Sequence, residues 1–257
     1  MMSSVENSIE IRDLHVSYKS LQSFSLKKSL LRLGKNKKEV FEAVKGVSFD
    51  VKKGSVVGIV GKNGSGKSTL LRTVAGIYSP NKGKIDTFGH SVSLLAIGVG
   101  FQKDLSGREN IFLSSLLMGF TEAQIREHIN EIIEFSELGK FIDKPVRTYS
   151  SGMFSKLAFS ITAVMKTDIM LIDEVLSVGD SRFKKKSFKK IKELISDKNR
   201  TVLIVSHSND TLLKLCTEIV WINEGTLVMQ GDPQEVIEKY EEFMSQEAPE
   251  KKSKKGS

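Results

Sequence analysis

The chain has 257 residues, with 39 Lys and Arg against 31 Asp and Glu, a formal net charge of +8 and a single cysteine. Its apolar fraction of 39% is ordinary for a globular protein and excludes disorder over most of the length. No apolar run approaches the roughly 18 residues of a membrane-spanning helix. One cysteine excludes an internal disulfide and a cysteine-based zinc cluster, and it favours a reducing, cytosolic setting.

The basic charge is concentrated in three segments. Residues 19–40 carry seven basic side chains and one acidic, residues 182–192 carry seven and none, and residues 251–255 carry four. The remainder of the chain is therefore net acidic. This distribution indicates patches that face particular partners, and it argues against a general polyanion-binding protein, so we expect no nucleic-acid partner.

The N-terminal part has the pattern of strands. Residues 9–18 show two short apolar alternations with a slip between them, which predicts a first edge strand. Residues 19–40 mix basic and apolar side chains, and we predict a basic insertion there, either an amphipathic helix or a loop. Residues 44–50 alternate again. Residues 55–60 are an apolar run typical of a buried parallel strand.

Two capping boxes follow, Ser106 with Glu109 and Thr121 with Gln124. In such a box the hydroxyl covers an orphan backbone N–H at a helix start, and the acid or amide three residues later reaches back. They predict consecutive helices and, with them, a helical subdomain over about residues 102–165.

The C-terminal part alternates between strand and helix patterns. Residues 169–172 and 202–205 are buried-strand runs, and a lysine-rich helical stretch from about 182 to 196 separates them. A last amphipathic helix is expected within residues 231–245, and residues 246–257 have the composition of a disordered tail. This rhythm predicts an α/β fold with a mostly parallel sheet flanked by helices.

Residues 61–68, GKNGSGKS, fit the phosphate-binding pattern G-x-x-x-x-G-K-[ST] between an apolar strand and a plausible helix start at residues 69–71. Glycines let successive backbone N–H groups point into one concavity, and the helix N-terminus adds positive potential. Lys67 would meet the β and γ phosphates, and the Ser68 hydroxyl would bind Mg²⁺. The candidate nucleotide-binding residues are Gly61, Asn63, Gly64, Ser65, Gly66, Lys67, Ser68 and Thr69.

A phosphate-binding loop alone leaves kinases, GTPases and motor proteins open, and the second half of the chain narrows the choice. The apolar run 169–172 delivers Asp173 to the C-terminal end of a strand, where its carboxylate can hold the Mg²⁺ shell. Glu174 follows directly. A carboxylate beside the metal ligand can orient and polarise the attacking water as a general base.

Further segments make the sequence similar to the ATP-binding cassette (ABC) family, over nearly all of residues 1–245. Gln102, after GVGF, looks like the Q-loop glutamine, and YSSGM at residues 149–153 occupies the signature position. SVGD at residues 177–180 resembles the D-loop. His207, after the 202–205 run, resembles the switch histidine.

The resemblance implies a fold and its boundaries. It indicates a P-loop NTPase with an N-terminal antiparallel β subdomain and an inserted α-helical subdomain. The implied nucleotide-binding domain spans residues 1–245, with a core over about residues 1–101 and 166–230, the helical subdomain over about 102–165 and a C-terminal helix over 231–245.

The resemblance also implies roles. Gln102 would sense Mg²⁺ and the γ-phosphate and link the core to the helical subdomain. With Glu174 and His207 it would act in catalysis. Asp180 would contribute to nucleotide binding. In the family the signature segment binds the γ-phosphate held by the opposite subunit, so ATP would lie between two copies. The signature residues concerned are Ser150, Ser151 and Gly152.

The signature departs from the commoner LSGGQ, with Tyr149 for Leu, Ser151 for Gly and Met153 for Gln. The Ser150 hydroxyl and the backbone N–H groups remain, and they can bind an anion at a helix N-terminus. For the adenine ring the family places an aromatic residue after the first strand, which makes Tyr18 the candidate. Phe41 is the alternative, because the 19–40 insertion blurs which ring lies beside the base.

Within the family the sequence looks most like the ATP-binding subunits of bacterial polysaccharide exporters, those for teichoic acid, O-antigen and capsule, with the teichoic acid group nearest. The segments that carry this likeness are GVGFQ (98–102), LSGRENI (105–111), FIDKP (141–145), YSSGM (149–153) and EVLSVGD (174–180).

The likeness implies a homodimer of ATP-binding subunits on a separate transmembrane permease, at the cytoplasmic face of the cell membrane. The complex would export a lipid-linked polysaccharide. The 19–40 insertion would lie near the permease or form a solvated loop. We expect no carbohydrate-binding domain after residue 245.

Two alternatives stay open. One is an ABC exporter for a lipid, a peptide or a drug. The other is an ABC ATPase without a transport role, whose basic patches would bind nucleic acid.

Overall fold

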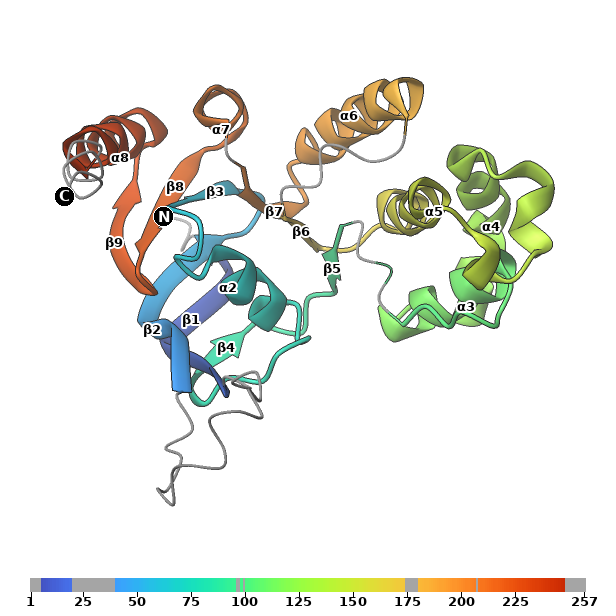
Figure 1. Cartoon of the computed structure of the whole chain (residues 1–257), viewed down its shortest axis with the longest axis horizontal. Coiled ribbons are helices and arrows are strands. Elements are labelled where there is room, and N and C mark those ends of the chain that lie inside the picture. The colour runs from blue at the N-terminus through green and yellow to red at the C-terminus, as the bar shows by residue number, and fades with distance from the viewer. Residues whose placement is uncertain are drawn as a thin grey trace, which may run out of the picture.

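The computed structural model describes residues 6–19, 40–95, 98, 100–173, 180–206 and 208–247. A six-stranded sheet lies at its centre (Figure 1). In spatial order its strands are β5 (Val92–Leu94), β6 (Ile169–Asp173), β7 (Thr201–Val205), β3 (Val56–Val60), β8 (Glu218–Asn223) and β9 (Thr226–Gly231). All neighbours are parallel except β8 and β9.

The three middle strands are the apolar runs of the sequence. Every residue of β3, β6 and β7 is buried, because helices or a second sheet cover both faces. The prediction of buried parallel strands is therefore confirmed.

A second, three-stranded antiparallel sheet has the order β2–β1–β4, with β1 at Asn7–Lys19, β2 at Val40–Lys52 and β4 at Lys82–Asp86. The pairing of β1 with β2 shifts register between Ile11 and Leu14, which is the slip seen in the sequence. The prediction of an edge strand is wrong, because β4 pairs with the other side of β1. β4 is mostly exposed and lacks apolar alternation, so it gave no strand signal.

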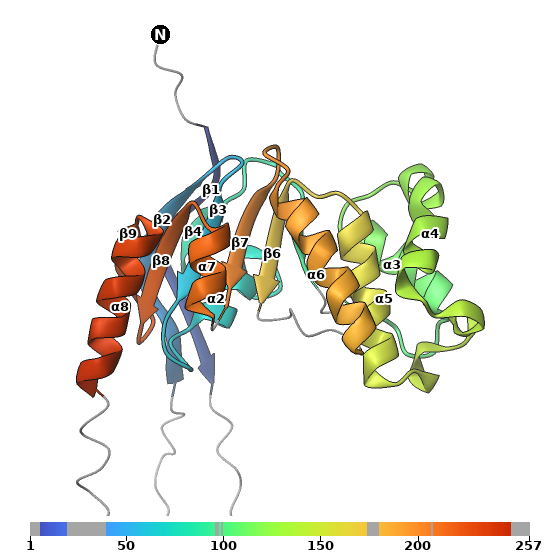
Figure 2. The ribbon, with the colours of Figure 1, turned by 90° about the horizontal axis from the view of Figure 1, so that it is seen from above.

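The helices form layers on the sheets (Figure 2). Helix α2 (Lys67–Val74) packs between the antiparallel sheet and one face of the central sheet, in a core that includes Leu70, Leu71 and Val74. The other face is covered by α6 (Ser181–Ile195), α7 (Asn209–Leu215) and α8 (Pro233–Glu247), with Phe183, Leu212 and Val236 in its core.

Helices α3 (Gly107–Leu117), α4 (Glu122–Ser136) and α5 (Ser151–Val164) stand together to one side of both sheets (Figure 1). Their own core contains Ile111, Ile125 and Leu157. Both predicted capping boxes are present at the starts of α3 and α4. Between α4 and α5 run two short 3₁₀ helices, Gly139–Asp143 and Val146–Thr148.

The predicted fold class is confirmed: a mostly parallel sheet flanked by helices, an antiparallel N-terminal sheet and an inserted helical unit. The last helix includes residues 246 and 247, which were predicted as tail. The predicted insertion at 19–40, except its two end residues, and the rest of the tail lie outside the described residues. No helix in the described part of the chain is both long and apolar enough to span a membrane.

Candidate functional site

The phosphate-binding loop connects buried strand β3 to helix α2. The helix begins at Lys67, two residues earlier than the sequence suggested, and Gly66 before it has φ +101°. A Cβ at Gly66 would lie 2.2 Å from the backbone oxygen of Ala43 in β2. Only glycine fits this close approach and this backbone conformation. The loop therefore packs directly against β2 of the antiparallel sheet.

Lys67 lies inside the loop that precedes it. Its side chain is 5% exposed, and Nζ donates hydrogen bonds to the backbone oxygens of Gly61 at 2.7 Å and Lys62 at 2.8 Å. The buried Ser65 hydroxyl has no hydrogen-bond partner among the described residues. Gly64 has φ +81° with open space beside it. A buried cation, an orphan hydroxyl and an open glycine turn fit the oxygens of a polyphosphate.

Two of the three candidate metal ligands, Ser68 and Asp173, meet at the edge where β3 and β6 both end. Ser68 Oγ donates a 2.9 Å hydrogen bond to Asp173 Oδ1, although the two residues are 105 apart in sequence. Asp173 is 8% exposed, and Arg72 Nη2 lies 3.9 Å from its other oxygen. A hydroxyl and a carboxylate oxygen side by side are ligands suited to Mg²⁺. Glu174 and His207, two of the three candidate catalytic residues, lie outside the described residues.

The two candidate adenine-binding rings are cross-strand neighbours, Tyr18 on β1 and Phe41 on β2. The Tyr18 hydroxyl donates to Thr69 Oγ1 at 3.0 Å, and its ring meets the edge of Tyr78 at 5.7 Å. Phe41 is 57% exposed. Tyr18 is therefore fixed against the first turn of α2, which holds the phosphate-binding loop, and Phe41 stands out into solvent.

Gln102 lies at the boundary between the sheet and the helical unit, and Asn110 of α3 holds its backbone. Gln102 N donates to Asn110 Oδ1 at 2.7 Å, and Asn110 Nδ2 donates to Gln102 O at 3.0 Å and to Ser106 O at 2.8 Å. Asn110 is fully buried. Sequence reasoning assigned it no role, although a buried Asn one residue after a capping-box Glu is a signal for such a contact.

The signature segment forms the start of helix α5. Ser150 is the N-cap, and its hydroxyl accepts a hydrogen bond from Met153 N at 3.2 Å. Ser151 is exposed, and Gly152 has only the Ser150 hydroxyl near the position of a Cβ, at 3.9 Å. Tyr149, which stands where the family has Leu, donates from its hydroxyl to the backbone oxygen of Phe141 at 2.7 Å.

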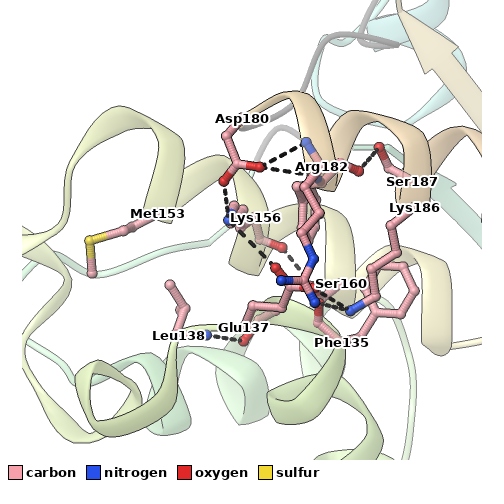
Figure 3. A network of polar contacts seen from close by, with 12 residues as sticks. Phe135, Glu137, Leu138, Met153, Lys156, Ser160, Asp180, Arg182, Lys186 and Ser187 are labelled. Atoms are coloured by element: carbon pink, nitrogen blue, oxygen red, sulfur yellow. Dashed lines mark hydrogen bonds and ion pairs between the residues drawn. The ribbon is translucent and has the colours of Figure 1, made fainter.

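Asp180 is the N-cap of α6. Its Oδ1 accepts hydrogen bonds from the backbone N of Arg182 and Phe183, and its Oδ2 accepts one from Lys156 of α5 at 2.7 Å (Figure 3). The ammonium and the capping bonds lower the pKa of Asp180 to about 2. Both carboxylate oxygens are thus used within the chain. Sequence reasoning did not identify Lys156.

The structure therefore brings together one half of the predicted site. Lys67, Ser68, Asp173, Thr69 and Tyr18 are linked around α2, which packs on β2, β6 and β7. The signature segment lies elsewhere, at the start of α5, which packs on α3, α4 and α6.

Comparison with known proteins identifies the family of this chain. The family model described as ABC transporter matches residues 44–177, which is more than half of the chain. The chain belongs to the ABC transporter family. Family membership and the topology together confirm the predicted P-loop NTPase fold.

Two curated relatives carry export names. The O-antigen export system ATP-binding protein RfbB of Myxococcus xanthus is 42% identical over 226 residues, which cover 86% of this chain and 52% of RfbB. The teichoic acids export ATP-binding protein TagH of Lactococcus lactis is 45% identical over 217 residues, covering 84% of this chain and 46% of TagH. This ABC chain thus spans about half the length of these two relatives.

A solved structure is similar in fold. The dimeric ATP-binding cassette MJ0796, bound to ADP and phosphate, superposes with a TM-score of 0.66 at 19% identity, covering 88% of this chain and 98% of the other. At this identity the likeness concerns the fold alone.

Proposed function

We propose that this chain binds and hydrolyses ATP as the energy-coupling subunit of an ABC transporter that exports a lipid-linked polysaccharide of the teichoic acid, O-antigen or capsule type. The observation that carries the proposal is the loop around Lys67 with the Ser68–Asp173 pair beside it. The export names of the relatives support the cargo class.

ATP would enter with its phosphates in the loop. Lys67 would turn from the backbone oxygens of Gly61 and Lys62 to the β and γ phosphates, and the N–H groups of residues 63–69 would surround the β-phosphate. Ser68 and Asp173 would separate to hold Mg²⁺ between them. Mg²⁺ held there would supply positive charge against the negative charge that develops on the phosphates during transfer.

Hydrolysis would require groups from two copies. In one copy, Glu174 would take a proton from the attacking water, with Gln102 and His207 near the γ-phosphate. Ser150, Ser151 and Gly152 of the second copy would bind the γ-phosphate at the N-terminus of α5. ATP would then hold two copies together, and release of phosphate would let them part.

The proposed mechanism implies two kinds of partner, a second copy of this chain and a membrane protein. Two copies of the chain would bind a separate transmembrane permease at the cytoplasmic face of the membrane, and their closure would drive the polymer across. The alternatives are a lipid, peptide or drug as cargo, or an ATPase without a permease.

The test is co-purification of the tagged chain with the membrane proteins encoded beside it, followed by an ATPase assay with and without lipid-linked glycans. We expect a complex whose turnover responds to the polymer. A Lys67→Ala variant should still co-purify but should lose ATP binding. A chain that purifies alone, with turnover indifferent to any membrane partner, would refute the transport function.

The general-base assignment has its own test. Glu174→Gln keeps the shape of the side chain but removes the base, so ATP binding should persist while turnover falls by about 100-fold or more. Binding is measured with a fluorescent nucleotide and turnover by phosphate release. Full turnover in this variant would show that another group activates the water.

A further inference from the structure

A polar network joins the end of α4 to the second turn of α5 and the first two turns of α6. It consists of Glu137, Lys156, Asp180 and Lys186 (Figure 3). Glu137 ends α4 in a left-handed conformation, with φ +56°. Lys156 lies in α5, and Asp180 and Lys186 lie at the start of α6.

Lys156 is the centre of this network. Its Nζ lies 2.7 Å from Asp180 Oδ2 and 3.8 Å from Glu137 Oε2, and its side chain is only 15% exposed. It also lies over the ring of Phe183, with Nζ 5.0 Å from the ring centre. One ammonium group thus contacts the end of α4 and the start of α6 from within α5.

A second cation fixes the same elements. Lys186 Nζ donates to Glu137 Oε1 at 3.0 Å and to the backbone oxygen of Phe135 at 3.0 Å. Beneath these contacts the rings of Phe135, Phe159 and Phe183, from α4, α5 and α6, lie 5.9 Å apart in each pair. The three helices are therefore held together, and Lys156 fixes the position of Asp180, the N-cap of α6, relative to α5.

The Lys156–Asp180 bond connects two segments that the sequence analysis singled out. Lys156 stands in the second turn of the helix that the signature segment begins, and Asp180 is the last residue of the segment that resembles the D-loop. The Lys156–Asp180 bond is a direct link between the two segments within one chain. Under the proposed function the signature segment binds the nucleotide of the opposite copy, so the position of Asp180 relative to that segment bears on hydrolysis.

We propose that Lys156 is a positioning residue for ATP hydrolysis. It holds Asp180 at a fixed place relative to the signature segment, and it touches no reacting atom itself. This inference rests on the proposed function, because it needs two copies that share the nucleotide. It also assigns Asp180 a bridging role within the chain in place of direct nucleotide contact.

Removal of this link should affect geometry more than stability. Asp180 is 59% exposed, so its oxygen stays hydrated when the ammonium is gone, and Met at 156 keeps an apolar stem against Phe183. The capping bonds from Arg182 and Phe183 also remain. A Lys156→Met chain should therefore fold, with the two segments less well aligned.

The experiment measures kcat and KM for ATP, nucleotide binding and the thermal midpoint of the full chain and its variants, in the complex with its membrane partner. Lys156→Met should lower kcat by about tenfold with KM and the midpoint nearly unchanged. Lys156→Arg should recover most of the loss. The double variant Lys156→Met with Asp180→Asn should be no worse than the poorer single variant, because the two residues act through one contact.

Lys190→Met is the matched control. Lys190 lies on α6 and, like Lys156, faces a carboxylate of the α4 region, with Nζ 3.9 Å from Glu131 Oε1. Among the described residues it makes no contact with Asp180. Its kcat should stay within about twofold of the wild type. A normal kcat in Lys156→Met, an equal loss in Lys190→Met, or a loss confined to KM would overturn the inference. If the wild type itself shows no turnover, the proposed function fails as well, so the two failures are distinguishable.

Discussion

The contact between Asn110 and Gln102 allows a prediction worked from the structure. In Asn110→Ala, three backbone oxygens keep another donor: Gln102 O keeps Leu105 N, Leu105 O keeps Val146 N, and Ser106 O keeps the backbone N of residue 110. The backbone N–H of Gln102 loses its 2.7 Å acceptor. The perturbation therefore removes the side-chain bonds and leaves one amide without a partner.

The loss of stability in Asn110→Ala can be estimated from these lost hydrogen bonds. An orphaned backbone amide costs about 1–3 kcal/mol and a lost hydrogen bond about 1 kcal/mol, so we expect the free energy of unfolding to fall by about 2–3 kcal/mol. For a chain of this size that corresponds to a thermal midpoint lower by about 5–10 °C. Because Gln102 is no longer held, kcat for ATP should also fall, by about tenfold.

The assay is thermal and urea unfolding together with steady-state ATP hydrolysis. Ser115→Ala is the control, because Ser115 is equally buried on the same helix and its hydroxyl has no hydrogen-bond partner among the described residues. Its removal should be neutral or slightly stabilising. The reasoning is refuted if Asn110→Ala costs less than about 0.5 kcal/mol, or if Ser115→Ala costs as much as Asn110→Ala.

Two further predictions concern the nucleotide site. Asp173→Asn should raise the Mg²⁺ concentration for half-maximal turnover by about 10- to 100-fold, whereas Asp168→Asn, before the same strand and bonded to Ser91, should not change it. A magnesium titration of the ATPase activity tests this. If Asp173→Asn and the wild type show the same Mg²⁺ dependence, Asp173 is not a metal ligand. Tyr18→Ala should raise the Kd for ATP by about tenfold, because a lost stacking contact costs about 1–3 kcal/mol. Phe41→Ala should change it less, since nothing holds that exposed ring in place, and the reverse order in a fluorescent-nucleotide assay would assign the adenine contact to Phe41.

The features that could be predicted from sequence are those encoded in consecutive residues. The phosphate-binding loop, the capping boxes at Ser106 and Thr121, and the apolar runs of β3, β6 and β7 each need only a short window, because local backbone bonding and burial on both faces determine their composition. The order of these motifs also indicated the family. The roles of Glu174 and His207 stay predictions.

Only the tertiary structure decided which distant residues meet. β1 became a central strand because the polar, exposed β4 pairs with it, and no pattern in either segment encodes that pairing. Ser68 and Asp173 lie 105 residues apart and touch because parallel strands bring their C-terminal ends to one edge. The Lys156–Asp180 bond likewise depends on how α5 packs beside α6. Such contacts are set by side-chain packing between elements, which a single sequence does not record.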